Sequence, residues 1–122
     1  MAGPAQSRIV LVASPKGGVG KSSLCRNILV GAAKEGLRVL GVDLDQQQTL
    51  AKWRARRERV RQTYPECPEV PVVAAPIGEW RSTLKGAADY DLVVIDTPPS
   101  IEAVAAQPGA RMDWPWSVAR MA

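Results

Sequence analysis

A glycine-rich segment near the N-terminus constrains the fold of this chain more than any other feature. It reads Lys16-Gly17-Gly18-Val19-Gly20-Lys21-Ser22 and lies between an apolar run, residues 9–13, and a stretch of helical periodicity, residues 21–35. A loop of this kind exposes successive backbone N–H groups, and the helix after it adds the positive end of its dipole. Glycines let the backbone approach phosphate oxygens closely. The segment therefore predicts a phosphate-binding loop between a strand and a helix.

Each residue type in the loop has its own chemical task. The Lys21 side chain can reach the β- and γ-phosphates of a nucleotide, and the Ser22 hydroxyl suits Mg²⁺. Pro15 stands where the general pattern has glycine, so that pattern is matched only when its first position is relaxed. The alternative is a glycine-rich turn that binds nothing, which the flanking strand and helix disfavour. The candidate nucleotide-binding residues are Lys16, Gly17, Gly18, Val19, Gly20, Lys21, Ser22 and Ser23.

Length and composition limit the class of protein. A chain of 122 residues with 46% hydrophobic and 23% charged residues suits one small globular domain. No apolar run approaches the roughly 20 residues that cross a bilayer, and the first residues do not read as a secretory signal. We therefore expect a cytoplasmic protein. The sequence has no histidine, so any hydrolysis would rely on carboxylates, lysine or positioned water.

Strand and helix signals alternate along the chain, which predicts an α/β fold with a parallel sheet flanked by helices. The predicted strands are residues 8–13, 37–42, 70–74 and 91–96, and the predicted helices are residues 21–35, 49–61 and 79–88. Thr49 is the expected N-cap of the second helix. About four strands are present, and the phosphate-binding loop after the first of them predicts a P-loop NTPase sheet. Ligands of such sheets bind beyond the carboxyl ends of the strands.

Carboxylates follow two of the predicted strands at that edge. Asp96 ends the apolar run 92–95, where a carboxylate can hold Mg²⁺ through water opposite the loop serine. Asp43 and Asp45 follow the second strand. A carboxylate near the γ-phosphate can accept a hydrogen bond from the attacking water and align it. The alternatives are an aspartate that caps a strand end and a polar turn, which the convergence with the loop disfavours.

The doubled lysine of Lys16-Gly17-Gly18-Val19-Gly20-Lys21-Ser22, together with Asp43-Leu44-Asp45-Gln46-Gln47, resembles the ParA/MinD ATPases with their deviant Walker A loop. The chain is most similar to the short ParA-type partition proteins. The resemblance implies ATP and Mg²⁺ as cofactors, with Ser22, Asp43 and Asp96 at the metal. It implies that Asp45 orients water and that Lys16 reaches the phosphates of the other subunit in an ATP-dependent homodimer. Gln46 replaces the family's proline, which puts the shape of that turn in doubt.

The same resemblance implies partners. Relatives bind DNA non-specifically and respond to a centromere-binding, ParB-like protein, and no membrane partner is expected. Nucleoid association would follow if this chain binds DNA. The basic run in residues 52–61 is either a phosphate-contacting face or the solvated face of a surface helix, and composition alone favours the second.

The resemblance covers residues 8–100. We therefore expect residues 1–100 to be the N-terminal part of a ParA-type ATPase domain and residues 101–122 to be an irregular or aberrant tail. On this interpretation the chain is C-terminally truncated. Three functions stay open: an ATP-hydrolysing plasmid or chromosome partition protein, a non-catalytic nucleotide-binding remnant, and another deviant Walker A ATPase of the MinD kind. Whether the chain is itself an enzyme is left open.

Overall fold

Strands and helices alternate through most of the part of the chain that the computed structural model describes, which is residues 7–13, 20–98 and 116–120. The strands are β1 (Arg8–Ala13), β2 (Val39–Asp43), β3 (Val72–Ala74), β4 (Leu92–Asp96) and β5 (Trp116–Arg120). The helical elements are α1 (Lys21–Lys34), α2 (Thr49–Thr63), η1 (Ile77–Glu79), α3 (Trp80–Thr83) and η2 (Leu84–Asp89). This order confirms the predicted α/β architecture.

The strands form a single parallel sheet in the order β3-β2-β4-β1-β5. The β4 strand lies between β1 and β2, and its Asp96 is in register with Val12 on one side and Asp43 on the other. Because the strands are parallel, the segments that follow β1, β2 and β4 all emerge at the same edge. That edge is where the predicted loop and the predicted carboxylates meet.

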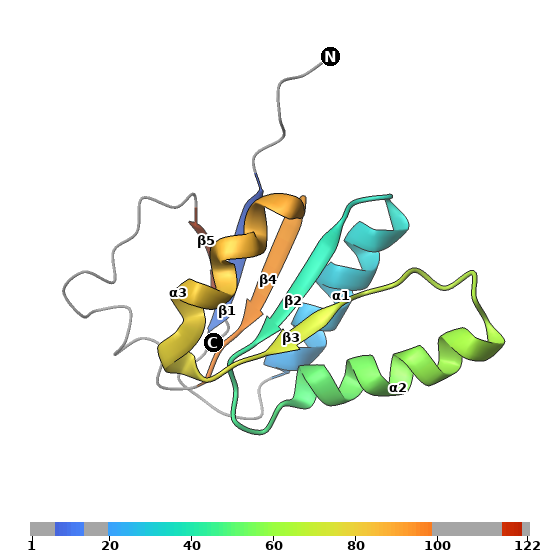
Figure 1. Ribbon diagram of the computed structural model, residues 1–122, viewed down its shortest axis with the longest axis horizontal. Coiled ribbons are helices and arrows are strands. Elements are labelled where there is room, and N and C mark those ends of the chain that lie inside the picture. The colour runs from blue at the N-terminus through green and yellow to red at the C-terminus, as the bar shows by residue number, and fades with distance from the viewer. Residues whose placement is uncertain (1–6, 14–19, 99–115, 121–122) are drawn as a thin grey trace, which may run out of the picture.

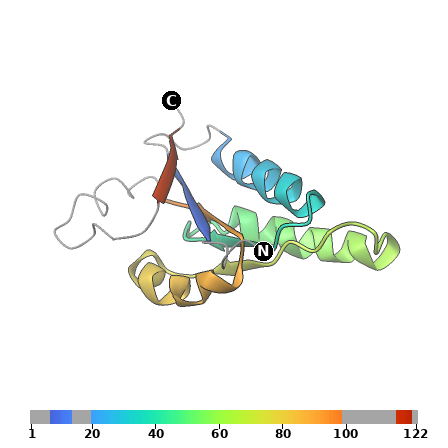
Figure 2. The same ribbon diagram turned by 90° about the horizontal axis from the view of Figure 1, so that it is seen from above.

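Helical elements cover both faces of the sheet (Figures 1 and 2). The α1 and α2 helices lie on one face, and the η1–α3–η2 segment lies on the other. Successive residues of a strand point to opposite faces, so Leu11 belongs to one core cluster and Val12 to the other. The core on the α1 and α2 face contains Val12, Cys25, Leu29, Val39, Leu50, Val70 and Val94. The opposite core contains Ile9, Leu11, Leu40, Val42, Leu44, Leu84, Ala87, Val93 and Ile95.

Gly41, in the middle of β2, allows α1 and α2 to approach the sheet. A Cβ atom at this position would lie 3.0 Å from Leu29 Cδ1, 3.1 Å from Val72 Cγ2 and 3.3 Å from Leu50 Cδ2. These distances are tighter than ordinary van der Waals contact, so a larger residue would push three neighbours apart. The glycine therefore sets how closely the first turn of α2 packs, and that turn follows directly from the candidate site.

Several predicted boundaries need correction. The second strand begins at Val39 instead of residue 37, and the third is confined to Val72–Ala74 because Pro71 has no N–H for the ladder. The helix predicted over residues 79–88 is instead the succession η1, α3 and η2. Gly86 lies within that stretch and disfavours a continuous α-helix.

The predicted cap of the second helix is also wrong. Thr49 is the first residue of α2, and the capping position is Gln48, with a φ of 54° and no capping hydrogen bond from its side chain. The Asp43 carboxylate serves that purpose instead, because its Oδ2 accepts a hydrogen bond from the backbone N–H of Ala51 at 3.0 Å. A residue at the end of β2 therefore satisfies a donor in the first turn of α2.

The tail expected over residues 101–122 contains a regular element. Trp116–Arg120 forms β5, which pairs with β1 in parallel register from Ile9↔Trp116 to Ala13↔Arg120. Without this partner the outer N–H and C=O groups of β1 would have no strand to bond. The residues of the tail show no strand periodicity, so the sequence predicts an irregular segment. The strand depends instead on pairing with β1, a distant segment of the chain. None of the helices described in the structure is long and apolar enough to cross a membrane.

Candidate functional site

Lys21 lies at the centre of the polar cluster at the carboxyl edge of the sheet. It is the first residue of α1 and follows Gly20, whose φ of 85° favours glycine. Its side chain is 9% exposed, and its Nζ lies 3.4 Å from Asp96 Oδ1 and 3.5 Å from Asp45 Oδ2. The ammonium group also donates a hydrogen bond to the carbonyl of Thr97. Segments after β1, β2 and β4 therefore converge on one cation.

Ser22 and Asp96 form the oxygen-rich part of the cluster. The Ser22 hydroxyl donates a 2.7 Å hydrogen bond to Asp96 Oδ2. Asp96 is fully buried, and its Oδ1 accepts no hydrogen bond from the described residues, although it faces the Lys21 ammonium. A buried carboxylate oxygen with spare acceptor capacity, beside a hydroxyl, fits Mg²⁺, which prefers hard oxygen ligands.

A metal at this place would need more ligands than these side chains offer. Among the described residues, no group of three His, Cys, Asp or Glu side chains could hold a metal ion. Mg²⁺ usually keeps several waters and is bound through one or two carboxylates together with substrate phosphates. Ser22 and Asp96 therefore fit a metal that is bound together with a nucleotide, because these two side chains do not by themselves form a complete set of protein ligands.

Asp43 is 1% exposed and has a structural task. Its Oδ1 accepts the N–H of Asp45 and its Oδ2 accepts the N–H of Ala51, both at 3.0 Å. Burial raises the pKa of the Asp43 carboxyl above its ordinary value, while these two hydrogen bonds act in the opposite direction. The carboxylate thus ties the end of β2 to the turn and to α2, and it fixes the backbone of Asp45.

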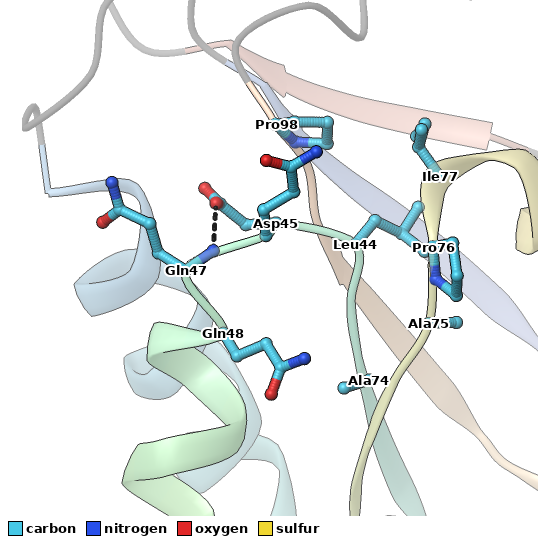
Figure 3. A pocket seen from close by; sticks show the side chains of 10 residues that line it. Leu44, Asp45, Gln47, Gln48, Ala74, Ala75, Pro76, Ile77 and Pro98 are labelled. Carbon is cyan, nitrogen blue, oxygen red and sulfur yellow. Dashed lines mark hydrogen bonds between the residues drawn. The ribbon is translucent and has the colours of Figure 1, made fainter.

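Asp45 is held in a tight turn that directs its carboxylate toward Lys21. Its Oδ1 accepts the N–H of Gln47 at 3.0 Å (Figure 3), and its carbonyl accepts the N–H of Gln48 at 3.0 Å. An aspartate that bonds its own backbone two residues on stabilises such turns. The side chain stays 24% exposed, and its Oδ2 lies 3.5 Å from Lys21 Nζ.

Thr97 is the residue that sequence reasoning missed. It is fully buried, its hydroxyl donates to the carbonyl of Val12 at 2.7 Å, and its own carbonyl accepts from Lys21. Val12 is the penultimate residue of β1, so Thr97 joins the end of that strand to the end of β4. The available signal was its position directly after Asp96 at the end of a buried strand.

A cavity of about 680 Å³ opens beyond β2 and β3, next to the cluster (Figure 3). Asp45 is the one ionisable residue among those that line it, and the wall combines three glutamines with small apolar side chains. The lining residues are Leu44, Asp45, Gln46, Gln47, Gln48, Ala74, Ala75, Pro76, Ile77 and Pro98. The volume is in the range of pockets for small molecules.

The remaining predicted residues are not part of the cluster as described. Lys16, Gly17, Gly18 and Val19 lie outside the described residues. Ser23 is exposed, and its hydroxyl accepts a hydrogen bond from the Arg26 guanidinium at 2.7 Å. Of the residues predicted to bind nucleotide, Lys21 and Ser22 therefore lie together with Asp45 and Asp96, and Gly20 is the N-cap of α1.

Three comparisons give this geometry a family context. Residues 10–115 match the model of the CobQ/CobB/MinD/ParA nucleotide-binding domain. The chain is 35% identical over 112 residues to the maintenance of carboxysome distribution protein A of Gloeobacter kilaueensis. The aligned region covers 84% of this chain and 45% of that protein. The chain therefore spans less than half the length of that relative.

Solved structures share the fold. Cobyrinic acid a,c-diamide synthase from Mycobacterium smegmatis, solved with ADP and magnesium, aligns over 79% of this chain and 52% of its own, with 25% identity and a TM-score of 0.60. The pNOB8 ParA protein, solved bound to nonspecific DNA, aligns over 77% of this chain and 47% of its own, with 18% identity and a TM-score of 0.54. With the family model spanning most of the chain, this protein belongs to the CobQ/CobB/MinD/ParA family of nucleotide-binding P-loop domains.

Proposed function

We propose that this chain binds and hydrolyses ATP with Mg²⁺, as the nucleotide-binding part of a ParA-type protein that segregates plasmid or chromosomal DNA. The observation that carries the proposal is the convergence of Lys21, Ser22, Asp45 and Asp96 at one edge of the sheet. A buried cation held at 3.4–3.5 Å from two carboxylates can exchange those carboxylates for phosphate oxygens without losing charge compensation.

The residues have distinct tasks in this proposal. Lys21 binds the β- and γ-phosphates, together with the backbone N–H groups of the loop and of the first turn of α1, which have no intrahelical acceptor. Ser22 and Asp96 hold Mg²⁺, which neutralises charge on the phosphates when it is bound. Asp43 acts indirectly near the metal, because it fixes the turn that carries Asp45.

Asp45 accepts a hydrogen bond from the attacking water and aligns it with the γ-phosphate. Its geometry supports this role, because the turn binds one carboxylate oxygen, the other lies beside Lys21, and the side chain is partly exposed. Lys16 completes the phosphate site of a second copy in an ATP-dependent homodimer, as the resemblance to ParA proteins implies. A cation supplied in this way would stabilise charge on the transferred phosphoryl group.

The biological role is inferred from relatives. One relative is named for maintaining the distribution of carboxysomes, and a structural neighbour is a ParA protein solved with nonspecific DNA. The first name supports a protein that positions cargo, and the second supports a protein that contacts DNA. The resemblance to ParA proteins adds a ParB-like partner that stimulates hydrolysis and a location on the nucleoid. A remnant that binds nucleotide without turnover is the second candidate, because the chain covers about half of its structural relatives.

Equilibrium binding of a fluorescent ATP analogue with Mg²⁺ tests the nucleotide site. The full 122-residue chain is compared with Lys21→Ala and with Lys34→Ala, which removes an exposed lysine at the other end of the same helix. We expect saturable binding by the wild type and Lys34→Ala, with unlabelled ATP competing, and a loss of at least about 100-fold in Lys21→Ala. Equal binding by all three proteins would refute the site.

Phosphate release then separates the two candidate functions. We expect slow turnover of ATP by the wild type and a further loss in Asp45→Asn, with nucleotide affinity preserved. Binding without any turnover above Lys21→Ala would favour the non-catalytic remnant.

A further inference from the structure

The positive charge of this protein is concentrated on α2. The helix contains six of the sixteen Lys and Arg residues and one of the twelve Asp and Glu residues. It therefore carries a net charge of +5, whereas the whole chain carries +4, which leaves the rest at −1. The cations of α2 are Lys52, Arg54, Arg56, Arg57, Arg59 and Arg61. Among the helices and strands that the structure describes, α2 is therefore the one strongly basic element.

Three of these cations face inward and hold the segment that returns from α2 to β3. Arg57 donates to the carbonyl of Pro68 through Nη2 at 2.9 Å and Nε at 3.3 Å, and its guanidinium lies 5.7 Å from the Trp53 ring centre. Arg61 Nε donates to the carbonyl of Cys67 at 2.9 Å. Arg54 Nη2 lies 4.0 Å from a carboxylate oxygen of Glu69. The inward cations therefore have structural partners.

The other three cations form a basic stripe, Lys52, Arg56 and Arg59, on the outer face of α2. Their spacing of four and three places them on one side of the helix, and all three are exposed. None makes an ion pair or hydrogen bond through its side chain to a described residue. Like charges at these spacings repel one another. An anion laid along the helix would relieve that repulsion.

We propose that the basic stripe contacts the phosphates of double-stranded DNA. From Lys52 to Arg59 the helix rises about 10 Å, a length over which one strand of DNA presents about three phosphates. The α2 helix extends outward past β3, the edge strand of the sheet (Figure 1), and all three side chains of the stripe are exposed. The choice of duplex DNA as the polyanion rests on the proposed partition function.

The composition of the outer face favours nucleic acid over a membrane surface. A helix that lies in a bilayer interface needs an apolar face opposite its charges. In α2 the apolar side chains Leu50 and Trp53 face the core beneath α1, where Leu50 is fully buried. Among the exposed residues of α2 the apolar ones are Ala55 and Val60. The stripe therefore offers charge without an apolar surface to insert.

Salt-dependent DNA binding tests the stripe directly. Fluorescence anisotropy with a short, labelled, random-sequence duplex is measured for the wild type and for the triple variant Lys52→Ala/Arg56→Ala/Arg59→Ala over a series of salt concentrations. We expect the slope of log K against log salt to become shallower by about 2.7, or 0.9 for each lost phosphate contact. At 0.1 M salt the affinity should fall by more than about 100-fold.

A matched variant separates local contacts from total charge. Arg8→Ala/Lys34→Ala/Lys85→Ala removes the same charge from exposed cations outside α2 and should leave the slope unchanged. Arg56→Lys/Arg59→Lys keeps the charges on the stripe and should also retain the slope, with helical circular dichroism showing that each variant is folded. Equal losses in both triple variants, or no binding of DNA by the wild type, would overturn the proposal, as would binding to anionic lipid vesicles but not to DNA.

Nucleotide binding in the same proteins keeps the two proposals distinguishable. The stripe triple variant should bind the fluorescent ATP analogue as the wild type does, because the stripe lies outside the site. A wild type that binds nucleotide but not DNA would overturn the stripe and leave the nucleotide site standing. Stripe-dependent DNA binding in a chain that binds no nucleotide would support the stripe and refute the proposed ATPase.

Discussion

Two regions of this molecule are rich in charge and differ in how that charge is held. At the carboxyl edge of the sheet, the Lys21 ammonium is buried 3.5 Å from Asp45 Oδ2 and 3.4 Å from Asp96 Oδ1. On the outer face of α2, the basic stripe is exposed and has no partner among the described residues. Burial makes the first set interdependent, whereas solvent makes the second set nearly independent. The contrast predicts very different responses to substitution.

The largest effect is expected from Asp96→Ala. The substitution leaves the buried Lys21 ammonium with Asp45 as its remaining carboxylate and removes the acceptor of the Ser22 hydroxyl. Loss of one partner of a buried pair costs about 3 kcal/mol or more. Urea unfolding measures this loss. Glu58→Ala is the control, because Glu58 pairs with Arg61 where both side chains are partly exposed to solvent, and its loss should cost about 1 kcal/mol or less. Similar losses in the free energy of unfolding for Asp96→Ala and Glu58→Ala would show that burial of the charged groups does not make the difference.

A smaller effect is expected from Thr97→Val, which preserves shape but removes the hydroxyl. The carbonyl of Val12 then loses its 2.7 Å hydrogen bond in a fully buried place. An unsatisfied buried polar group costs about 1–3 kcal/mol. The same unfolding experiment checks it, and nucleotide affinity should also fall because the end of β1 leads into the loop. No change in either quantity would show that Thr97 does not connect the two strands.

The pH dependence of stability probes Asp43. Because burial raises the pKa of this carboxyl above 3.8 in the folded protein, the folded state keeps its proton at a pH where the unfolded state has lost it. The free energy of unfolding contributed by Asp43 therefore falls as pH rises from 3.8 through the folded pKa. Asp43→Asn has no carboxyl to titrate and therefore lacks this pH-dependent contribution to stability. It also loses one of the two backbone hydrogen bonds.

Stability of the wild type and of Asp43→Asn, measured side by side across that pH range, isolates the effect. The advantage of the wild type over the variant should shrink as pH rises. An advantage that grows with pH would mean that the hydrogen bonds outweigh burial and that the folded pKa is lowered.

The smallest effect on stability is expected from the stripe triple variant. Substitutions of exposed side chains are usually within about 0.5 kcal/mol, and removal of like charges at helical spacing adds a few tenths in favour of folding. Thermal unfolding at low salt should show an unchanged or slightly higher midpoint, and added salt should narrow any difference. A marked loss of stability would place these cations in the structural group with Arg57 and Arg61.

The sequence predicted those parts of the fold that depend on local patterns. Residues 8–13 form β1 as expected because a continuous apolar run marks a strand covered on both faces. The strand ends alone predicted that the loop, Asp43 and Asp96 lie at one edge of the sheet, whereas Asp45 was singled out by the resemblance to ParA/MinD ATPases. The roles of these residues in binding and catalysis stay predictions.

Contacts between distant residues could not be predicted in the same way. The cap of α2 comes from Asp43, which lies eight residues before Ala51, the residue whose N–H it accepts. Local sequence patterns do not reveal such a cap and favour Thr49 instead. β5 exists through its pairing with β1, which lies about a hundred residues earlier in the chain. The division of α2 into inward and outward cations depends on a returning loop whose carbonyls carry no sequence signal.

We propose above all that Lys21, the cation between Asp45 and Asp96, binds the phosphates of the nucleotide. Thermal unfolding with and without saturating Mg²⁺ and ATP tests it in one experiment, because a ligand that binds only the folded state stabilises it by about 2.7 kcal/mol at 100 times its Kd. We expect a clear rise in the unfolding midpoint for the wild type and for Lys34→Ala, and no rise for a folded Lys21→Ala. The same rise in Lys21→Ala would contradict it.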